Sequence, residues 1–154
     1  ADDKSRRYSG GMKRRLMIGM ALLHKPKMLF LDEPTVGLDP QVRRKMWDLI
    51  RKMNEAGMTV LLTTHYIEEA DQLCRRVAIM NRGRIIAVDT PQKLKEKVGR
   101  VVVEHMEADG MINNFFDNRE QAASYVAGLD SNATVREANL EDVFIELTGR
   151  RVND

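Results

Sequence analysis

The sequence has a single cysteine, no long apolar run and almost no net charge. Cys74 is the only cysteine among 154 residues, so an internal disulfide is impossible and a reducing compartment is the natural one. No apolar run approaches the ~20 residues that a membrane span needs, and no signal peptide is recognisable. We therefore expect a soluble chain, with any membrane connection made through a partner.

The charge balance indicates no strongly charged ligand. The 25 Lys and Arg residues oppose 23 Asp and Glu residues, for a net charge of +2. The basic clusters at 13–15, 43–45 and 75–76 fall in separate predicted elements, so their charges do not combine into one strong electrostatic field. We interpret them as solvated helix faces. Nucleic acid is not an expected partner. A hydrophobic content of 43% is enough for a packed core in one domain or two small ones.

A phosphate-binding loop is also missing from the sequence. That loop has the pattern G-x-x-x-x-G-K-[ST], in which backbone amides and the lysine hold the phosphates of a nucleotide. None of the 10 glycines is followed by lysine. A nucleotide site in this chain would therefore be incomplete.

Two other segments carry the chemistry of a nucleotide site. Ser9-Gly10-Gly11 opens a predicted helix over 11–24, where glycine lets backbone amides approach an anion and Ser9 is a good N-cap. The apolar run 28–31 predicts a strand buried on both faces, and it ends in Asp32 and Glu33, whose carboxylates can hold Mg²⁺ and position a water. Taken alone, these segments could be an ordinary helix cap and a polar strand end.

The next segments predict a βαβ unit. Asp39-Pro40 begins a helix that Gly57 ends, and the run 58–64 predicts a second buried strand followed by His65. Parallel strands joined in this way have their carboxyl ends at one edge of the sheet. We expect Asp32, Glu33 and His65 at that edge. Asp32 and Glu33 are adjacent, so on an extended strand they project in opposite directions and can serve two functions.

The remainder predicts further short elements. These are a helix over 67–73, a hairpin of 77–80 and 84–88, and a helix from Thr90-Pro91 to about 98. Beyond Gly99 we expect a strand over 101–103, a loop over 110–118, a helix over 119–127 and a strand over 134–137. A closing helix, capped by Asn139, is predicted to bury Leu140, Phe144 and Leu147.

From Tyr8 to about Gly99 the sequence resembles the second half of an ATP-binding cassette (ABC) ATPase. Ser9-Gly10-Gly11 resembles the family signature, 29–33 its Walker B strand, 35–39 its D-loop and His65 its switch histidine. The resemblance implies an α/β fold: a partial P-loop NTPase lobe over residues 1–99 that lacks the Walker A half. The tail 139–150 resembles that of drug- and polysaccharide-exporter cassettes, so a small α+β extension is expected over 100–154. The chain looks like a fragment.

The family implies a role for each candidate residue. Asp32 would hold Mg²⁺, Glu33 would be the general base, and His65 would reach the γ-phosphate of ATP. The signature Ser9, Gly10 and Gly11 would bind an ATP held by the P-loop of a second ABC ATPase subunit, although Tyr8 and Met12 replace the commoner leucine and glutamine. Asp39 belongs to the D-loop and is equally well explained as a helix cap. His24, His105 and Cys74 are interpreted as structural.

We therefore expect the ATP-hydrolysing subunit of an ABC transporter of the exporter type that works with a transmembrane permease. It would be cytoplasmic and peripheral at the inner face of the cell membrane. The chain alone would be inactive and would self-associate. Two alternatives remain open: a soluble ABC ATPase unconnected with transport, and a non-catalytic regulatory or assembly module, which the missing P-loop favours for this chain.

Overall fold

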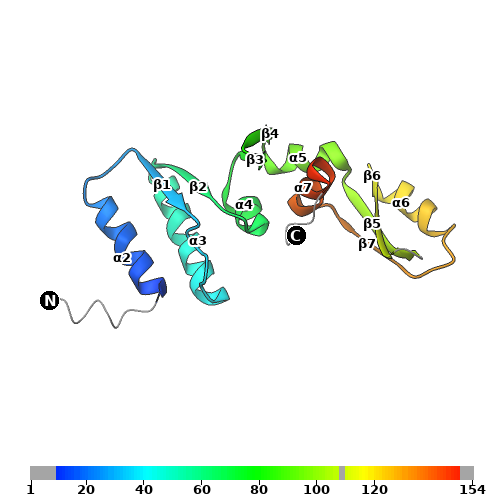
Figure 1. Ribbon diagram of the computed structural model, residues 1–154, viewed down its shortest axis with the longest axis horizontal. Coiled ribbons are helices and arrows are strands. Elements are labelled where there is room, and N and C mark those ends of the chain that lie inside the picture. The colour runs from blue at the N-terminus through cyan, green and yellow to red at the C-terminus, as the bar shows by residue number, and fades with distance from the viewer. Residues whose placement is uncertain (1–9, 108–109, 150–154) are drawn as a thin grey trace. The chain divides into compact units, whose positions relative to one another are not determined.

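The chain folds into two units, residues 1–69 and 70–154, in a computed structural model that describes residues 10–107 and 110–149. Both units contain helices and strands (Figure 1). Helix α4 (Ile67–Leu73) contains the division between them. Ser9 and Tyr8 of the predicted signature lie outside the described residues.

The first unit contains the predicted βαβ arrangement. Helix α2 (Gly10–Leu22) precedes strand β1 (Met28–Asp32), helix α3 (Pro40–Glu55) and strand β2 (Thr59–Thr63). The two strands pair in parallel, with Met28 opposite Thr59 and Asp32 opposite Thr63. Helix α3 contacts β2, and four of its side chains are buried: Met46, Trp47, Ile50 and Met53. The predicted α/β fold class is confirmed for this unit.

The strands of this unit are less buried than their sequences predict. Only Leu29 and Leu31 of β1 are buried, while Phe30 on the other face is 67% exposed. Leu61, which lies opposite Phe30 in β2, is 47% exposed. The expectation of strands buried on both faces is wrong for the described structure, because a two-stranded sheet with α3 against β2 has one covered face and one open face.

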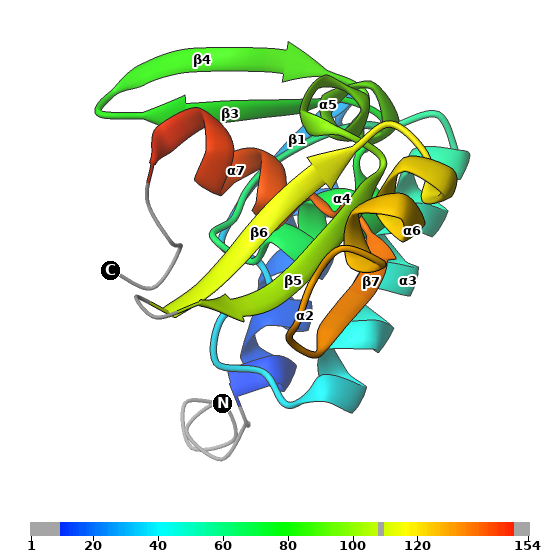
Figure 2. The same cartoon turned by 90° about the vertical axis from the view of Figure 1, so that its right-hand side faces the viewer.

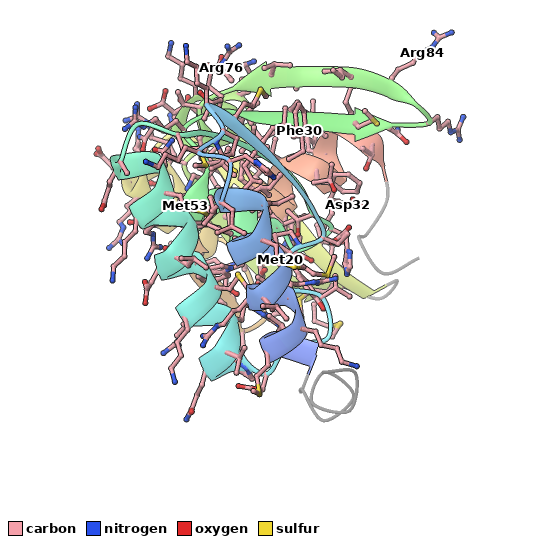
Figure 3. The ribbon with its side chains drawn as sticks, turned by 90° about the vertical axis from the view of Figure 1, so that its left-hand side faces the viewer. Met20, Phe30, Asp32, Met53, Arg76 and Arg84 are labelled. Atoms are coloured by element: carbon pink, nitrogen blue, oxygen red, sulfur yellow. The ribbon has the colours of Figure 1, made fainter. Side chains whose placement is uncertain are left out.

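Helix α2 also differs from its predicted pattern. The apolar residues whose helical spacing favours this helix are all exposed: Met12, Leu16, Met20 and Leu23. Figure 3 shows Met20 on the outer surface of the helix. The buried positions are Gly11 and Ile18, seven residues apart on one face of the helix. The helix packs through this narrow face, where Gly11 lies against Val42 of α3.

The second unit begins with the predicted hairpin. Strands β3 (Val77–Asn81) and β4 (Arg84–Asp89) pair antiparallel around Arg82-Gly83, both of which have positive φ. Helix α5 (Pro91–Val98) follows, with the Thr90 hydroxyl accepting a hydrogen bond from the amide of Lys93. These elements agree with the sequence prediction to within one residue at each end.

A three-stranded antiparallel sheet forms the rest of this unit. Its strand order is β6-β5-β7, with β5 at Val101–Glu107, β6 at Gly110–Phe116 and β7 at Ala133–Glu137. Helices α6 (Arg119–Val126) and α7 (Leu140–Thr148) lie on opposite sides of it (Figure 2). Because both faces are covered, Val102 and Val103 are both fully buried although they point in opposite directions.

Two predictions for this region are wrong. The segment predicted as a loop over 110–118 is mostly strand β6, because pairing with β5 along its whole length outweighs the loop-like composition of Asn113-Asn114. Helix α7 has the predicted Asn139 cap, but it buries Val143 with Leu140, while Leu147 is 41% exposed and Phe144 is half-buried. The buried face of α7 is thus rotated by about one residue from the predicted one.

A charged cluster attaches α7 to the sheet. The guanidinium of Arg136 in β7 forms two hydrogen bonds of 2.7 Å with the carboxylate of Asp142, which is 2% exposed. It also contacts Glu104 of β5 at 2.7 Å. These hydrogen bonds, those with Asp142 first, raise the pKa of Arg136 above its usual value, although burial opposes them. Arg136 therefore stays charged and holds the helix against the sheet.

The boundary between the two units of the structure falls after residue 69, whereas the sequence favours a domain boundary at residue 99. Helix α5 contacts both β4 and α7, so the elements on either side of residue 99 belong to one unit. A separate extension over 100–154 remains a prediction. None of the helices in the described ranges, 10–107 and 110–149, is long and apolar enough to cross a membrane.

Candidate functional site

The candidate site lies where β1 and β2 end. The two strands run parallel with Asp32 opposite Thr63, so the residues that follow each strand, Glu33 and His65, come together at one edge. Figure 3 shows Asp32 near the end of β1, beyond Phe30. The predicted juxtaposition of Asp32, Glu33 and His65 is therefore present in the structure.

Glu33 and His65 form a direct pair. The Nδ1 atom of His65 lies 3.0 Å from Oε1 of Glu33, and the His65 amide donates to Oε2 at 3.4 Å. The side chains are 57% and 34% exposed for His65 and Glu33, respectively, so water reaches both. A carboxylate held beside an imidazole can accept a proton from water while the ring keeps it oriented. This geometry suits a general base.

The backbone at Glu33 differs from the sequence expectation. Its φ is +46°, in the left-handed region that non-glycine residues rarely occupy. The amide of Glu33 still donates to the Thr63 carbonyl at 3.0 Å, which continues the strand pairing by one residue. The expected opposite projection of Asp32 and Glu33 from an extended strand is therefore wrong, because the chain turns at Glu33. The turn brings the Glu33 carboxylate to His65.

Asp32 stays on the strand, on the open face that also carries Phe30. The Thr63 hydroxyl donates a hydrogen bond to its Oδ1 atom. No group of three or more His, Cys, Asp or Glu side chains in the described part of the chain could hold a metal by itself. Mg²⁺ commonly binds one or two carboxylates together with water and substrate phosphates, and Asp32 fits that requirement.

The segment after Glu33 leads into α3. Thr35 is fully buried, Gly37 has a φ of +73°, and Leu38 is 9% exposed. Asp39 is the N-cap of α3, since its Oδ1 accepts from the amides of Gln41 at 3.1 Å and Val42 at 2.9 Å. The predicted role of Asp39 as a helix cap is thus present in the structure, and its carboxylate is turned toward the start of α3.

The two glycines of the predicted signature differ in their surroundings. Gly10 begins α2 and has open space where a side chain would be. Gly11 is buried, and a Cβ there would lie 2.8 Å from Cγ1 of Val42. Gly10 is thus free to face an anion at the helix N-terminus, whereas Gly11 is required for packing of α2 on α3.

The segment around His65 is anchored by α3. The ring of Tyr66 lies 4.4 Å from the His65 ring and has the guanidinium of Arg43 above it at 4.6 Å. One turn of α3 further along, the indole N–H of Trp47 donates to the fully buried Glu69 at 3.0 Å. Helix α3 therefore holds the chain just after His65, at Tyr66 and Glu69.

Sequence reasoning missed one residue of this site. Arg14 of α2 lies with its Nη1 atom 2.5 Å from the carbonyl oxygen of Glu33. The basic cluster 13–15 was interpreted as a solvated helix face, but Arg14 is three residues after Gly11 and four before Ile18, on the buried face. The helical spacing of Gly11 and Ile18 was the signal that could have identified it.

The chain is similar in sequence to several known proteins. A family model described as ABC transporter matches residues 1–36. The chain is 36% identical to a linearmycin resistance ATP-binding protein of Bacillus subtilis (strain 168), with 100% of this chain and 60% of that protein covered. It is 40% identical to a Nod factor export ATP-binding protein of Burkholderia pseudomallei (strain K96243), with 100% and 58% covered. The chain thus spans less than two thirds of the length of these curated relatives.

Two solved structures are also similar. One is a dimeric ATP-binding cassette in a post-hydrolysis state bound to ADP and Pi, with a TM-score of 0.50, 31% identity, and 55% of this chain and 37% of that chain covered. The other is a nucleotide-free ATP-binding cassette from an ABC transporter, with a TM-score of 0.55, 27% identity, and 58% and 36% covered. The fold is therefore that of part of a cassette.

Proposed function

We propose that this chain, which belongs to the ABC transporter ATPase family, carries the hydrolytic half of an ATP site. The observation that supports the proposal most strongly is the Glu33–His65 pair beside Asp32, at the ends of adjacent parallel strands. The resemblance of 9–11 to the family signature adds the helix N-terminus that would bind the γ-phosphate of a second ATP.

Each residue has a defined part in the proposed reaction. Glu33 accepts a proton from the attacking water, which its position beside His65 and its exposure to solvent allow. His65 orients the Glu33 carboxylate and reaches the γ-phosphate. Asp32 holds Mg²⁺, which would neutralise charge on the phosphates. Phosphoryl transfer depends mainly on such positioning and neutralisation, so these three side chains supply most of what the water-activating side needs.

The phosphate-binding loop is absent from this sequence, since no glycine is followed by lysine. Most of the affinity for ATP should come from that loop, because its amides and lysine surround the phosphates. We therefore expect the chain by itself to bind ATP weakly and not to hydrolyse it. Micromolar affinity for ATP in calorimetry of the isolated chain would contradict this expectation.

The relatives support a proposal for the physiological partners. The similar proteins are named for linearmycin resistance and Nod factor export, which favours export as the process. The proposed assembly has two ABC ATPase subunits attached to a transmembrane permease, and the chain would lie at the cytoplasmic face of the membrane. A second candidate is a non-catalytic regulatory or assembly module.

The test replaces Glu33 by Gln. The full chain is combined with the Walker A half of a related cassette, and steady-state ATP hydrolysis and ATP binding are measured. Glu33→Gln should lower turnover by roughly 100-fold or more while ATP binding is kept, because general bases contribute on that order. Glu55→Gln, the same change at an exposed position near the end of α3, is the matched control.

The outcomes separate the two candidates. If Glu33→Gln leaves turnover unchanged, Glu33 is not the base and the catalytic proposal fails. A combined cassette that binds ATP but does not hydrolyse it, even with Glu33 present, would favour the non-catalytic module.

A further inference from the structure

Arg14 contacts the backbone of the candidate base. It is half-buried, while its neighbours Lys13 and Arg15 are exposed. Its Nη1 atom donates to the carbonyl oxygen of Glu33 at 2.5 Å and lies 3.4 Å from that of Val36. One guanidinium therefore reaches two carbonyls of the turn that follows β1.

The turn at Glu33 needs such support. A φ of +46° is disfavoured for a residue with a side chain, and such conformations persist where the surroundings impose them. In either of the common backbone conformations the Glu33 side chain would leave the strand end in another direction. Its 3.0 Å contact with His65 depends on the turn being held. Hydrogen bonds from a charged donor are the stronger kind, and arginine can serve two acceptors at once.

We propose that Arg14 is a positioning residue that fixes the left-handed turn at Glu33 and thereby aims its carboxylate at His65. The inference rests on the proposed role of Glu33 as base. It has a consequence for α2: since Arg14 is one turn after Gly11, a displacement of the start of this helix is transmitted to the Glu33 carbonyl through the same side chain. The position of α2 and the position of the Glu33 carbonyl are thus coupled through Arg14.

The first experiment measures amide hydrogen exchange by NMR in the full chain. In Arg14→Gln, the amides of Glu33 and His65, which donate to Thr63 O and Glu33 Oε2, should exchange about tenfold faster or more. The amide of Ile50, in the middle of α3, should be unchanged and reports global stability. Lys13→Gln removes the same charge from an exposed neighbour and should affect none of the three.

Unchanged exchange at Glu33 and His65 in Arg14→Gln overturns the proposal. If Ile50 also exchanges faster, the variant is globally destabilised and Arg14→Lys decides instead. The proposal requires Arg14→Lys to restore Ile50 but to leave Glu33 and His65 partly unprotected, because both contacts come from Nη1 and the lysine ammonium lies one bond closer to Cα than that atom. Full restoration by lysine at all three amides overturns the proposed need for arginine.

The second experiment measures ATP hydrolysis in the combined cassette. Arg14→Gln should lower kcat by about 10- to 100-fold with little change in the KM for ATP, since misplacing a catalytic group costs rate rather than binding. Faster exchange with an unchanged kcat would make the contact structural only and would overturn the positioning role. If Glu33→Gln itself leaves kcat unchanged, the proposed function fails, whereas the exchange result still decides whether Arg14 holds the turn.

Discussion

Single side chains in the first unit serve packing and the candidate site together. Gly11 belongs to the predicted signature, yet a Cβ there would lie 2.8 Å from Cγ1 of Val42, so any side chain would force Val42 to shift. Glu33 is the candidate base, and its left-handed backbone is also what turns the chain out of β1. A substitution at either residue would therefore change both stability and function, and the two effects have to be measured separately.

The packing role of Gly11 can be tested by substitution. Gly11→Ala should destabilise the chain by about 1–3 kcal/mol, because Val42 is β-branched and cannot rotate away from the new methyl group freely. Urea unfolding of the full chain measures the change. Gly19→Ala, in the same helix with nothing within 4 Å, should instead stabilise by about 0.5–1 kcal/mol.

A double variant identifies the cause. Val42→Ala removes the methyl groups nearest to Gly11, so Gly11→Ala in that background should cost much less. An equal cost in both backgrounds would mean that Gly11 is required for another reason.

One charged pair joins a helix to the sheet in the second unit. Helix α7, which also contacts α5, is attached to the β6-β5-β7 sheet by the Arg136–Asp142 pair. Asp142 also accepts the amide of Asn139 at 2.8 Å, which completes a capping box at the start of the helix. The start of α7 and its attachment to β7 therefore depend on the same carboxylate.

Removing Arg136 should weaken this attachment. Arg136→Met leaves the carboxylate of Asp142 buried without its main partner, so we expect a loss of about 2–4 kcal/mol in unfolding free energy. Arg119→Met is the control, since Arg119 forms an ion pair with Glu137 in which both side chains are about 80% exposed. That pair should contribute only about 0–1 kcal/mol. Equal losses in thermal or urea unfolding would contradict the assigned role of Arg136.

At the scale of the whole molecule, the first unit presents an open sheet face. Met28 and Phe30 of β1 and Leu61 of β2 share that face and are 41%, 67% and 47% exposed. Among the described residues β2 pairs with β1 alone, so its other edge carries unpaired backbone groups. An apolar face beside an open edge is a template for association.

The isolated chain is therefore expected to self-associate through β2. Leu61→Lys should give monomer or unfolded chain, because a charge on this face prevents a second copy from covering it. Leu16→Lys is the matched control, since Leu16 of α2 is also 47% exposed. Light scattering with and without denaturant measures the outcome. A monodisperse, cooperatively folded wild-type monomer at high concentration would show that the edge does not drive association.

The sequence predicts the order and type of most elements, because helix caps such as Asp39 and Asn139 and short apolar runs such as 28–31 act locally. It also predicted that Asp32, Glu33 and His65 meet, since the βαβ unit permits one handedness and one functional edge. Strand β6, the buried face of α7 and the turn at Glu33 were decided only by tertiary structure. Each depends on partners distant in the chain: β5, the sheet, and the guanidinium of Arg14 together with His65.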